Sequence, residues 1–142
     1  MNDISHYTGT ATIVRGLPGT STLIPSTNDI RFYNHLPAAE FNMEMEKADY
    51  VISRSGYSTV MDIVTLGKKS ILIPTPGQTE QEYLAGYLSA KKVAFSVEQQ
   101  EFSLYKALQK ASEYEYKNTG AINNSKLPLL IQSFLGRLPA AK

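Results

Sequence analysis

The segment SRSGYSTVMDI, residues 53–63, places small polar residues between an apolar run and a stretch with helical periodicity. A glycine there would let a ligand approach the main chain, and the free amides at the start of a helix could point at an anion. A neighbouring arginine would add a charged guanidinium group. The pattern is typical of a phosphate site built from the backbone, although any turn from a strand into a helix favours serine and glycine. The residues of this candidate phosphate site are Arg54, Ser55, Gly56, Tyr57, Ser58 and Thr59.

Asp62 lies one turn into the same expected helix. Its carboxylate could accept two hydrogen bonds from the diol of a ribose. Residues 59–62 also fit a capping box, in which Asp62 would reach back to the amide at the helix N-terminus. Both interpretations are compatible with the pattern.

A second candidate segment is PTPGQTEQEYLAG, residues 74–86, which again follows an apolar run and opens a helix. Its amide and carboxylate side chains are suited to hydrogen-bonding the hydroxyl groups of a sugar. The alternative is a second capping box at residues 79–82, with glutamates placed to suit the helix dipole. The side chains concerned are Gln78, Glu80, Gln81 and Glu82.

Strands and helices must position these two segments. Along the chain, short apolar runs typical of strands alternate with stretches of helical periodicity. We expect strands at 11–15, 30–34, 50–53, 70–74 and 93–97. We expect helices at 37–47, 58–66, 79–91, 102–116 and 127–138. This alternation predicts an α/β fold with a doubly wound, Rossmann-like parallel sheet.

Two stretches interrupt the alternation. Residues 16–29 contain two glycines, two prolines and several serines and threonines, which predicts a loop in place of a crossover helix. Residues 117–126 predict a polar linker, so that 117–142 form a linker and a C-terminal helix within a single domain of residues 1–142.

His35 follows the expected strand 30–34, at the same sheet edge as the two candidate segments. It is either a catalytic base or an ordinary loop residue.

Composition excludes several classes of protein. The 142 residues carry a net charge of +1, which does not favour nucleic acid as the main partner. The absence of cysteine excludes disulfides and thiolate metal sites. The sequence has no apolar run long enough for a membrane helix and no leader pattern, so we expect a cytoplasmic location.

The order and spacing of these motifs bring a family resemblance. Residues 48–88, ADYVISRSGYSTVMDIVTLGKKSILIPTPGQTEQEYLAGYL, resemble the donor-binding motif of glycosyltransferase family 28, typified by the peptidoglycan UDP-N-acetylglucosamine transferase. Members of this family are two-domain GT-B enzymes. The resemblance implies that the chain is most of the C-terminal, donor-binding half of such an enzyme, and it extends more weakly over residues 10–112.

The resemblance assigns roles to individual residues. It places the ribose-binding acid on Asp62, where the family usually has glutamate, and the sugar-reading glutamines on Gln81 and Glu82, the second of which departs from the family. It places the phosphate-binding turn on Ser55, Gly56, Tyr57, Ser58 and Thr59. It places the uracil pocket near Asn34, His35 and Leu36. No metal or other cofactor is expected, in agreement with the lack of an Asp-x-Asp motif.

The function implied is transfer of a hexosyl group from a UDP-sugar to an acceptor. The family's acceptor domain, which supplies the catalytic base, has no counterpart here, so an N-terminal domain or a partner subunit is expected, with membrane association through either. The first strand of the donor domain is also missing, and it would lie between strands 11–15 and 50–53. Residues 1–10 would fill this place, or two chains would associate through it as a homodimer. Alternatives are a separate donor subunit and a noncatalytic nucleotide-sugar-binding module.

Overall fold

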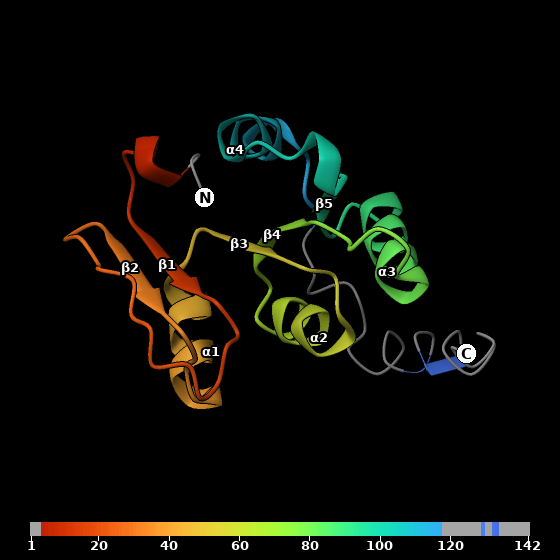
Figure 1. The fold of residues 1–142 in the computed structure, drawn as a ribbon. Helices are drawn as coiled ribbons and strands as arrows, with labels where there is room; N and C mark the ends of the chain where they lie inside the picture. Colours follow the sequence, from red (N-terminus) through yellow and green to blue (C-terminus); the bar gives the residue numbers. More distant parts are fainter. Residues whose placement is uncertain (1–3, 118–128, 130–131, 134–142) are drawn as a thin grey trace. The chain divides into compact units, whose positions relative to one another are not determined.

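The computed structural model describes residues 4–117, 129 and 132–133. The strands are β1 (Ala11–Val14), β2 (Ile30–Tyr33), β3 (Tyr50–Ser53), β4 (Lys69–Leu72) and β5 (Phe95–Ser96). The α-helices are α1 (Ala38–Lys47), α2 (Tyr57–Thr65), α3 (Thr79–Ala90) and α4 (Leu104–Glu113), in the order drawn in Figure 1. The predicted helix at 127–138 lies largely outside the described residues, as does most of the predicted linker.

All strand pairs are parallel, which confirms the predicted α/β class. The strands form two hydrogen-bonded sheets: β1 pairs with β2, and β3, β4 and β5 pair in that order. The chain likewise divides into two compact units, residues 1–47 and residues 48–142, each of which contains one of these sheets.

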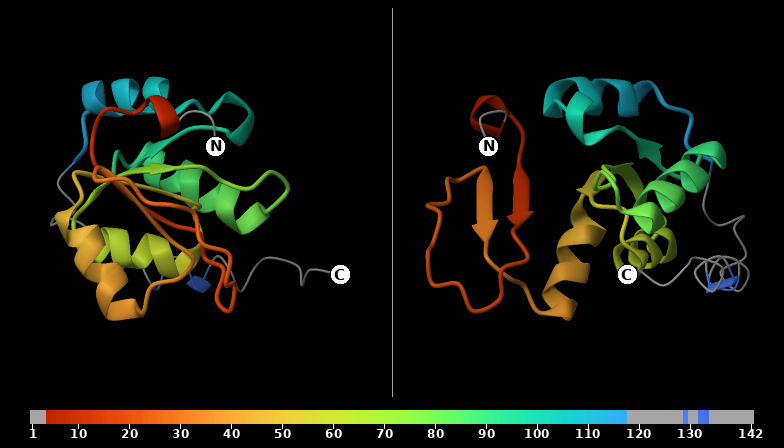
Figure 2. Two further views of the ribbon diagram at one scale, coloured as in Figure 1. Left: turned by 60° about the vertical axis from the view of Figure 1, so that its left-hand side comes forward. Right: turned by 45° about the vertical axis from the view of Figure 1, so that its right-hand side comes forward.

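In the first unit, β1 and β2 run side by side in the same direction (Figure 2). Glu44 of α1 ties the helix to both strands, because its carboxylate accepts hydrogen bonds from Thr12 at 2.7 Å and Arg31 at 2.8 Å. The bond from Thr12 holds the pKa of the Glu44 carboxyl below its usual value, and Lys47 and Arg31 act in the same direction. Glu44 is therefore charged where it joins sheet and helix.

The predicted loop at 16–29 is confirmed, and its last part lies along the outer edge of β2. The hydroxyl of Ser26 accepts the amide of Phe32 at 3.0 Å, and that of Thr27 accepts the amide of Ile30 at 3.0 Å. These bonds occupy amides at an edge that would otherwise be open to another strand.

In the second unit, the sheet separates helices on its two faces. Ile71 of β4 packs with Ala107 and Ala111 of α4, and Tyr50 and Ile52 of β3 pack against the same cluster. Because side chains alternate along a strand, the neighbours of Ile71 face the other side. Figure 1 shows α2 on the opposite side of β3 and β4 from α4. The sheet is thus doubly covered, as predicted from the alternation of elements.

Strand β5 is shorter than the predicted 93–97. The amides of Val93 and Ala94 bond to the carbonyl of Leu88 and so close the end of α3 before they can join the sheet. Lys92 has a φ of 58°, which turns the chain sharply at this point. Tight closure of α3 therefore delays the start of β5.

The N-terminal residues do not supply the strand expected from the resemblance. Among described residues 4–10, Ile4–His6 form a single 3-10 turn, and no strand is present. In the described part of the chain, no helix has the length and apolar character needed to cross a bilayer.

Candidate functional site

The turn after β3 ends in a helix whose first amides are open. The N-cap of α2 is Gly56, with φ −70° and ψ 147°, and no side chain caps this end. The first hydrogen bond of the helix runs from the amide of Val60 to the carbonyl of Gly56. The amides of Tyr57, Ser58 and Thr59 therefore have no acceptor within the helix, and they carry its partial positive charge.

Gly56 leaves space beside the helix N-terminus, and its backbone conformation does not require a glycine. Its φ of −70° is available to any residue, and a Cβ built there would meet no atom within 4 Å. The protein alone thus does not require glycine at this position. A ligand that lies against the helix N-terminus would use the space that a larger side chain would fill.

The capping box considered for residues 59–62 is wrong. Helix α2 begins two residues before Thr59, so Thr59 is its third residue and cannot be the N-cap. Asp62 lies one turn beyond Ser58 and Thr59 on the same side of the helix. It is half-buried, and no described residue forms a side-chain hydrogen bond with it.

Ser55 is fully buried, with 0% of its surface exposed. Its hydroxyl donates a hydrogen bond of 2.7 Å to the backbone carbonyl of Gln81 in the first turn of α3. The two residues are 26 positions apart. The hydroxyl of Ser55 therefore joins the turns that follow β3 and β4.

Arg54 makes a second connection between the same two turns. Its side chain is exposed, and Nη1 donates to the carbonyl of Ile73 at 3.2 Å and to that of Pro74 at 3.4 Å. The guanidinium group has further N–H donors, which could meet an anion at the same time.

In the turn after β4, two side chains of α3 bond to the backbone of the turn itself. Gln81 Oε1 accepts the amide of Thr75 at 3.0 Å, and Glu82 Oε1 accepts the amide of Gly77 at 2.9 Å. Gly77 has a φ of +79°, which a residue with a side chain would adopt only with strain. The predicted capping box at 79–82 is wrong, because the N-cap is Gln78 and no side chain caps the helix.

Gln81 and Glu82 each retain one polar group after these bonds. Gln81 has its NH₂ group, which donates, and Glu82 has its second carboxylate oxygen, which only accepts. Two neighbouring groups of opposite hydrogen-bonding character can bind two hydroxyls of one sugar. The same residues thus hold the loop and remain able to contact a ligand.

Three residues predicted near a uracil pocket belong to the first unit. Asn34 is engaged within it: its side-chain NH₂ donates to the carbonyls of Thr20 and Thr22 at 2.8 and 2.9 Å, and its oxygen accepts from Arg15 at 3.0 Å. His35 is exposed, and Leu36 is buried. The side chain of Asn34 therefore organises the 16–29 loop.

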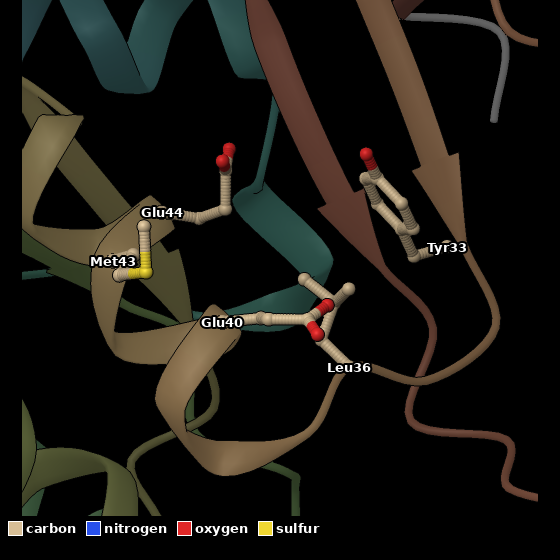
Figure 3. Close-up of a pocket in the computed structure, with 5 residues that line it drawn as sticks. All are labelled: Tyr33, Leu36, Glu40, Met43 and Glu44. Atoms are coloured by element: carbon tan, nitrogen blue, oxygen red, sulfur yellow. The ribbon is translucent and has the colours of Figure 1, made fainter.

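Leu36 lines a small hollow between β2 and α1 (Figure 3). Tyr33 stands on the strand side, and Glu40, Met43 and Glu44 stand on the helix side. The hollow holds about 110 Å³, whereas pockets for drug-sized ligands usually hold about 300–1,000 Å³. It is too small for a whole nucleoside.

Sequence reasoning did not assign these helix residues to a site. Their spacing at positions 40, 43 and 44 does place them on one side of α1, which was the available signal. Within the described residues, no group of three or more His, Asp or Glu could hold a metal ion.

A family model for the glycosyltransferase family 28 C-terminal domain matches residues 26–132. Among curated relatives, a UDP-N-acetylglucosamine–N-acetylmuramyl-(pentapeptide) pyrophosphoryl-undecaprenol N-acetylglucosamine transferase from Rhodopseudomonas palustris strain BisB18 is 36% identical over 83 residues, which is 57% of this chain and 21% of the relative. A relative with the same description from Rickettsia felis is 34% identical over 87 residues, covering 60% of this chain and 22% of the relative. The chain spans about a fifth of the length of these relatives.

Two solved structures share the fold. The spinosyn forosaminyltransferase SpnP matches with a TM-score of 0.55 and 14% identity, over 92% of this chain and 30% of its own. The glycosyltransferase SnogD from Streptomyces nogalater matches with a TM-score of 0.50 and 15% identity, over 91% of this chain and 36% of its own. At these identities the match concerns the fold alone.

Proposed function

Because the chain belongs to the family of glycosyltransferase family 28 C-terminal domains, we propose that it binds the UDP-sugar donor of a hexosyltransferase. The donor is held at the turns after β3 and β4, and the acceptor is bound elsewhere. The isolated chain is then the donor-binding part of a longer enzyme or of a complex, and by itself it does not transfer the sugar.

The observation that carries this proposal is the uncapped start of α2. Three backbone amides point out of the helix N-terminus, and Gly56 leaves open space beside them. This is the geometry in which helices bind phosphate groups. Asp62, one turn further along the same side, is placed to accept hydrogen bonds from the ribose hydroxyls.

The same groups would assist the reaction without a metal ion. As the sugar leaves, negative charge develops on the diphosphate, and the amides and helix dipole of α2 stabilise that charge. Arg54 adds a positive charge at the turn. Gln81 and Glu82 hold the sugar through the polar groups that their bonds to Thr75 and Gly77 leave free. These residues bind and orient the donor, and none of them acts as the base.

The relatives' descriptions name a pyrophosphoryl-undecaprenol acceptor, which supports a proposal for the acceptor. We propose that another domain of the same protein, or a partner subunit, binds an acceptor of this kind. The chain would act at the cytoplasmic side of a membrane through that part. Among described residues, β1 and β3 each pair with one strand. A strand of that domain or subunit, or a second copy in a homodimer, would pair with an open edge.

A calorimetric titration of this chain with UDP, UMP and ADP tests the proposal. We expect saturable binding of UDP that is stronger than that of UMP, which lacks the second phosphate, and of ADP, which lacks uracil. Asp62→Ala should weaken UDP binding by at least about tenfold, because two hydrogen bonds of a charged group are lost.

Asp49→Ala is the matched control, since Asp49 is exposed and precedes β3 at the opposite end from the turn. It should bind UDP as the wild type does. Equal affinity for UDP and ADP, or equal losses in the two aspartate variants, would contradict the proposal.

A further inference from the structure

Two serines in the second unit are equally buried but differ in their bonding. Ser55 and Ser70 both have 0% exposed surface. The hydroxyl of Ser55 donates to Gln81, whereas that of Ser70 has no hydrogen-bond partner among the described residues. A buried hydroxyl costs free energy unless it is bonded. The bond of Ser55 offsets that cost and fixes a contact between distant parts of the chain.

We infer that Ser55 is a positioning residue that sets the spacing between the start of α2 and the first turn of α3. Its hydroxyl is enclosed and engaged, so it contacts the protein and not the ligand. This role deepens the proposed function and rests on it, because the two helix starts hold the diphosphate and the sugar of one donor molecule.

Gln81 accepts hydrogen bonds from both turns. Its backbone carbonyl accepts from Ser55, and its side-chain oxygen accepts the amide of Thr75. A shift of the Ser55 bond would therefore move both the helix start and the loop after β4. Glu82, the next residue, holds Gly77 of the same loop. One buried hydroxyl thus determines the position of both sugar-contacting side chains relative to the phosphate turn.

Arg54 supports the same connection from the surface. Its bonds to the carbonyls of Ile73 and Pro74 join the two turns near the solvent. Bonds of an exposed, flexible side chain exchange readily with water, whereas the enclosed bond of Ser55 does not. The buried bond is therefore the more persistent of the two.

The consequence concerns ligands that span both turns. UDP alone needs the start of α2, while a UDP-sugar also needs Gln81 and Glu82 at the correct distance. Loss of the Ser55 bond should reduce the additional affinity that the sugar provides and affect UDP itself less. General destabilisation of the fold would weaken both ligands equally.

Amide hydrogen exchange and ligand titration of three variants test the inference. Ser55→Ala removes the bond, Ser55→Cys puts a somewhat larger group with a weak donor in its place, and Ser70→Ala removes an equally buried hydroxyl that lacks a partner among the described residues. In Ser55→Ala, exchange at the amides of Thr75 and Gly77 should become about fivefold faster, the change expected for one lost hydrogen bond. Ser55→Cys should fall between it and the wild type, and Ser70→Ala should match the wild type.

The ratio of the Kd of UDP to that of UDP-N-acetylglucosamine should fall by about the same factor in Ser55→Ala, by less in Ser55→Cys, and not in Ser70→Ala. Unchanged exchange at Thr75 and Gly77 in Ser55→Ala, or equal changes in Ser70→Ala, would overturn the inference. If exchange is faster only in the Ser55 variants but the wild-type chain binds no UDP, the coupling between the two turns is supported and the proposed function is overturned. The two failures are therefore distinguishable.

Discussion

The turns after β3 and β4 both lead from a parallel strand into a helix, and they differ in the bonds that side chains make to the loop backbone. At the first turn the N-cap is a glycine, and the amides of α2 have no side-chain partner. At the second turn, Gln81 and Glu82 reach back from α3 and bond to the amides of Thr75 and Gly77. Both helix starts are uncapped, but only at the second turn do side chains of the following helix bond to loop amides.

This difference suits the two turns to different ligand groups. An open set of backbone donors suits a phosphate, because it offers several N–H groups and a helix dipole but little shape. A loop fixed by side chains suits a sugar, because hydroxyl groups are recognised by polar atoms held at defined positions. The Ser55 and Arg54 bonds join the two turns, so the proposed phosphate and sugar contacts would belong to one site.

Gly56→Asp should have the largest effect on the difference between the two turns. The backbone of Gly56 has the extended geometry of a good N-cap, so aspartate should stabilise α2 by a few tenths of a kcal/mol. The same carboxylate would occupy the open amides and repel a diphosphate, and we expect UDP affinity to fall at least about tenfold. Thermal unfolding and calorimetry measure the two effects. Unimpaired UDP binding by this variant would show that the amides do not hold the phosphates.

Glu82→Ala changes the second turn alone. The amide of Gly77 would lose its acceptor, and stability should fall by about 1 kcal/mol or less, because the turn is exposed to water. UDP affinity should stay within about twofold of the wild type, whereas affinity for a UDP-sugar should fall by about fivefold. Glu80→Ala, in the same turn of α3, is the control for the charge at the helix start. It should leave both affinities unchanged. A larger loss for UDP than for the UDP-sugar would reverse the assignment of the two turns.

Tyr116→Phe should change the stability of the fold without changing ligand binding at either turn. The half-buried Tyr116 hydroxyl donates to the carbonyl of Ser70 at 3.0 Å, and burial raises its pKa, with further contributions from Tyr50 and Tyr114. The raised pKa means that its contribution to stability is fully present below the free tyrosine pKa of about 10 and is lost as the pH rises through the folded value. The variant should lose about 1 kcal/mol at pH 8 and less at higher pH.

Urea unfolding at pH 8 and at pH 10.5 measures this dependence, with the 78%-exposed Tyr105 changed to Phe as the control. UDP binding at pH 8 should not change in either variant. A wild-type stability that rises between these two pH values more than that of Tyr116→Phe would contradict the burial argument.

Gln78→Asp is the smallest change and the counterpart of Gly56→Asp. Gln78 is the N-cap of α3, and no side chain caps this helix, so aspartate should raise stability by a few tenths of a kcal/mol. It should leave UDP affinity unchanged, because the proposed diphosphate position is at α2. A fall in UDP affinity equal to that of Gly56→Asp would mean that both helix starts bind phosphate.

Much of the fold could be predicted from local pattern. The expected strands at 50–53 and 30–34 match β3 and β2 to within one residue, because short apolar runs between turn residues have few other stable arrangements. The exact helix starts could not be predicted. Thr59 and Thr79 both fit a local capping pattern, yet each lies inside its helix, because the preceding turn sets where the first helical bond forms.

The open start of α2 could be expected from the sequence, but the bonds around it could not. The small residues after β3 indicated an open helix start, and this depends only on neighbours in the sequence. The bond from Ser55 to Gln81 depends on how α2 and α3 pack, and the engagement of Asn34 depends on the path of the 16–29 loop. Such long-range contacts leave no periodic pattern in the sequence.

The central claim is that the open start of α2 binds the diphosphate, and an NMR titration of this chain with UDP tests it most directly. The amide signals of Tyr57, Ser58 and Thr59 should shift together and saturate with one Kd, and Gly56→Asp should abolish the shifts. Saturable UDP binding that leaves these three amides unmoved would contradict the claim and place the phosphate elsewhere.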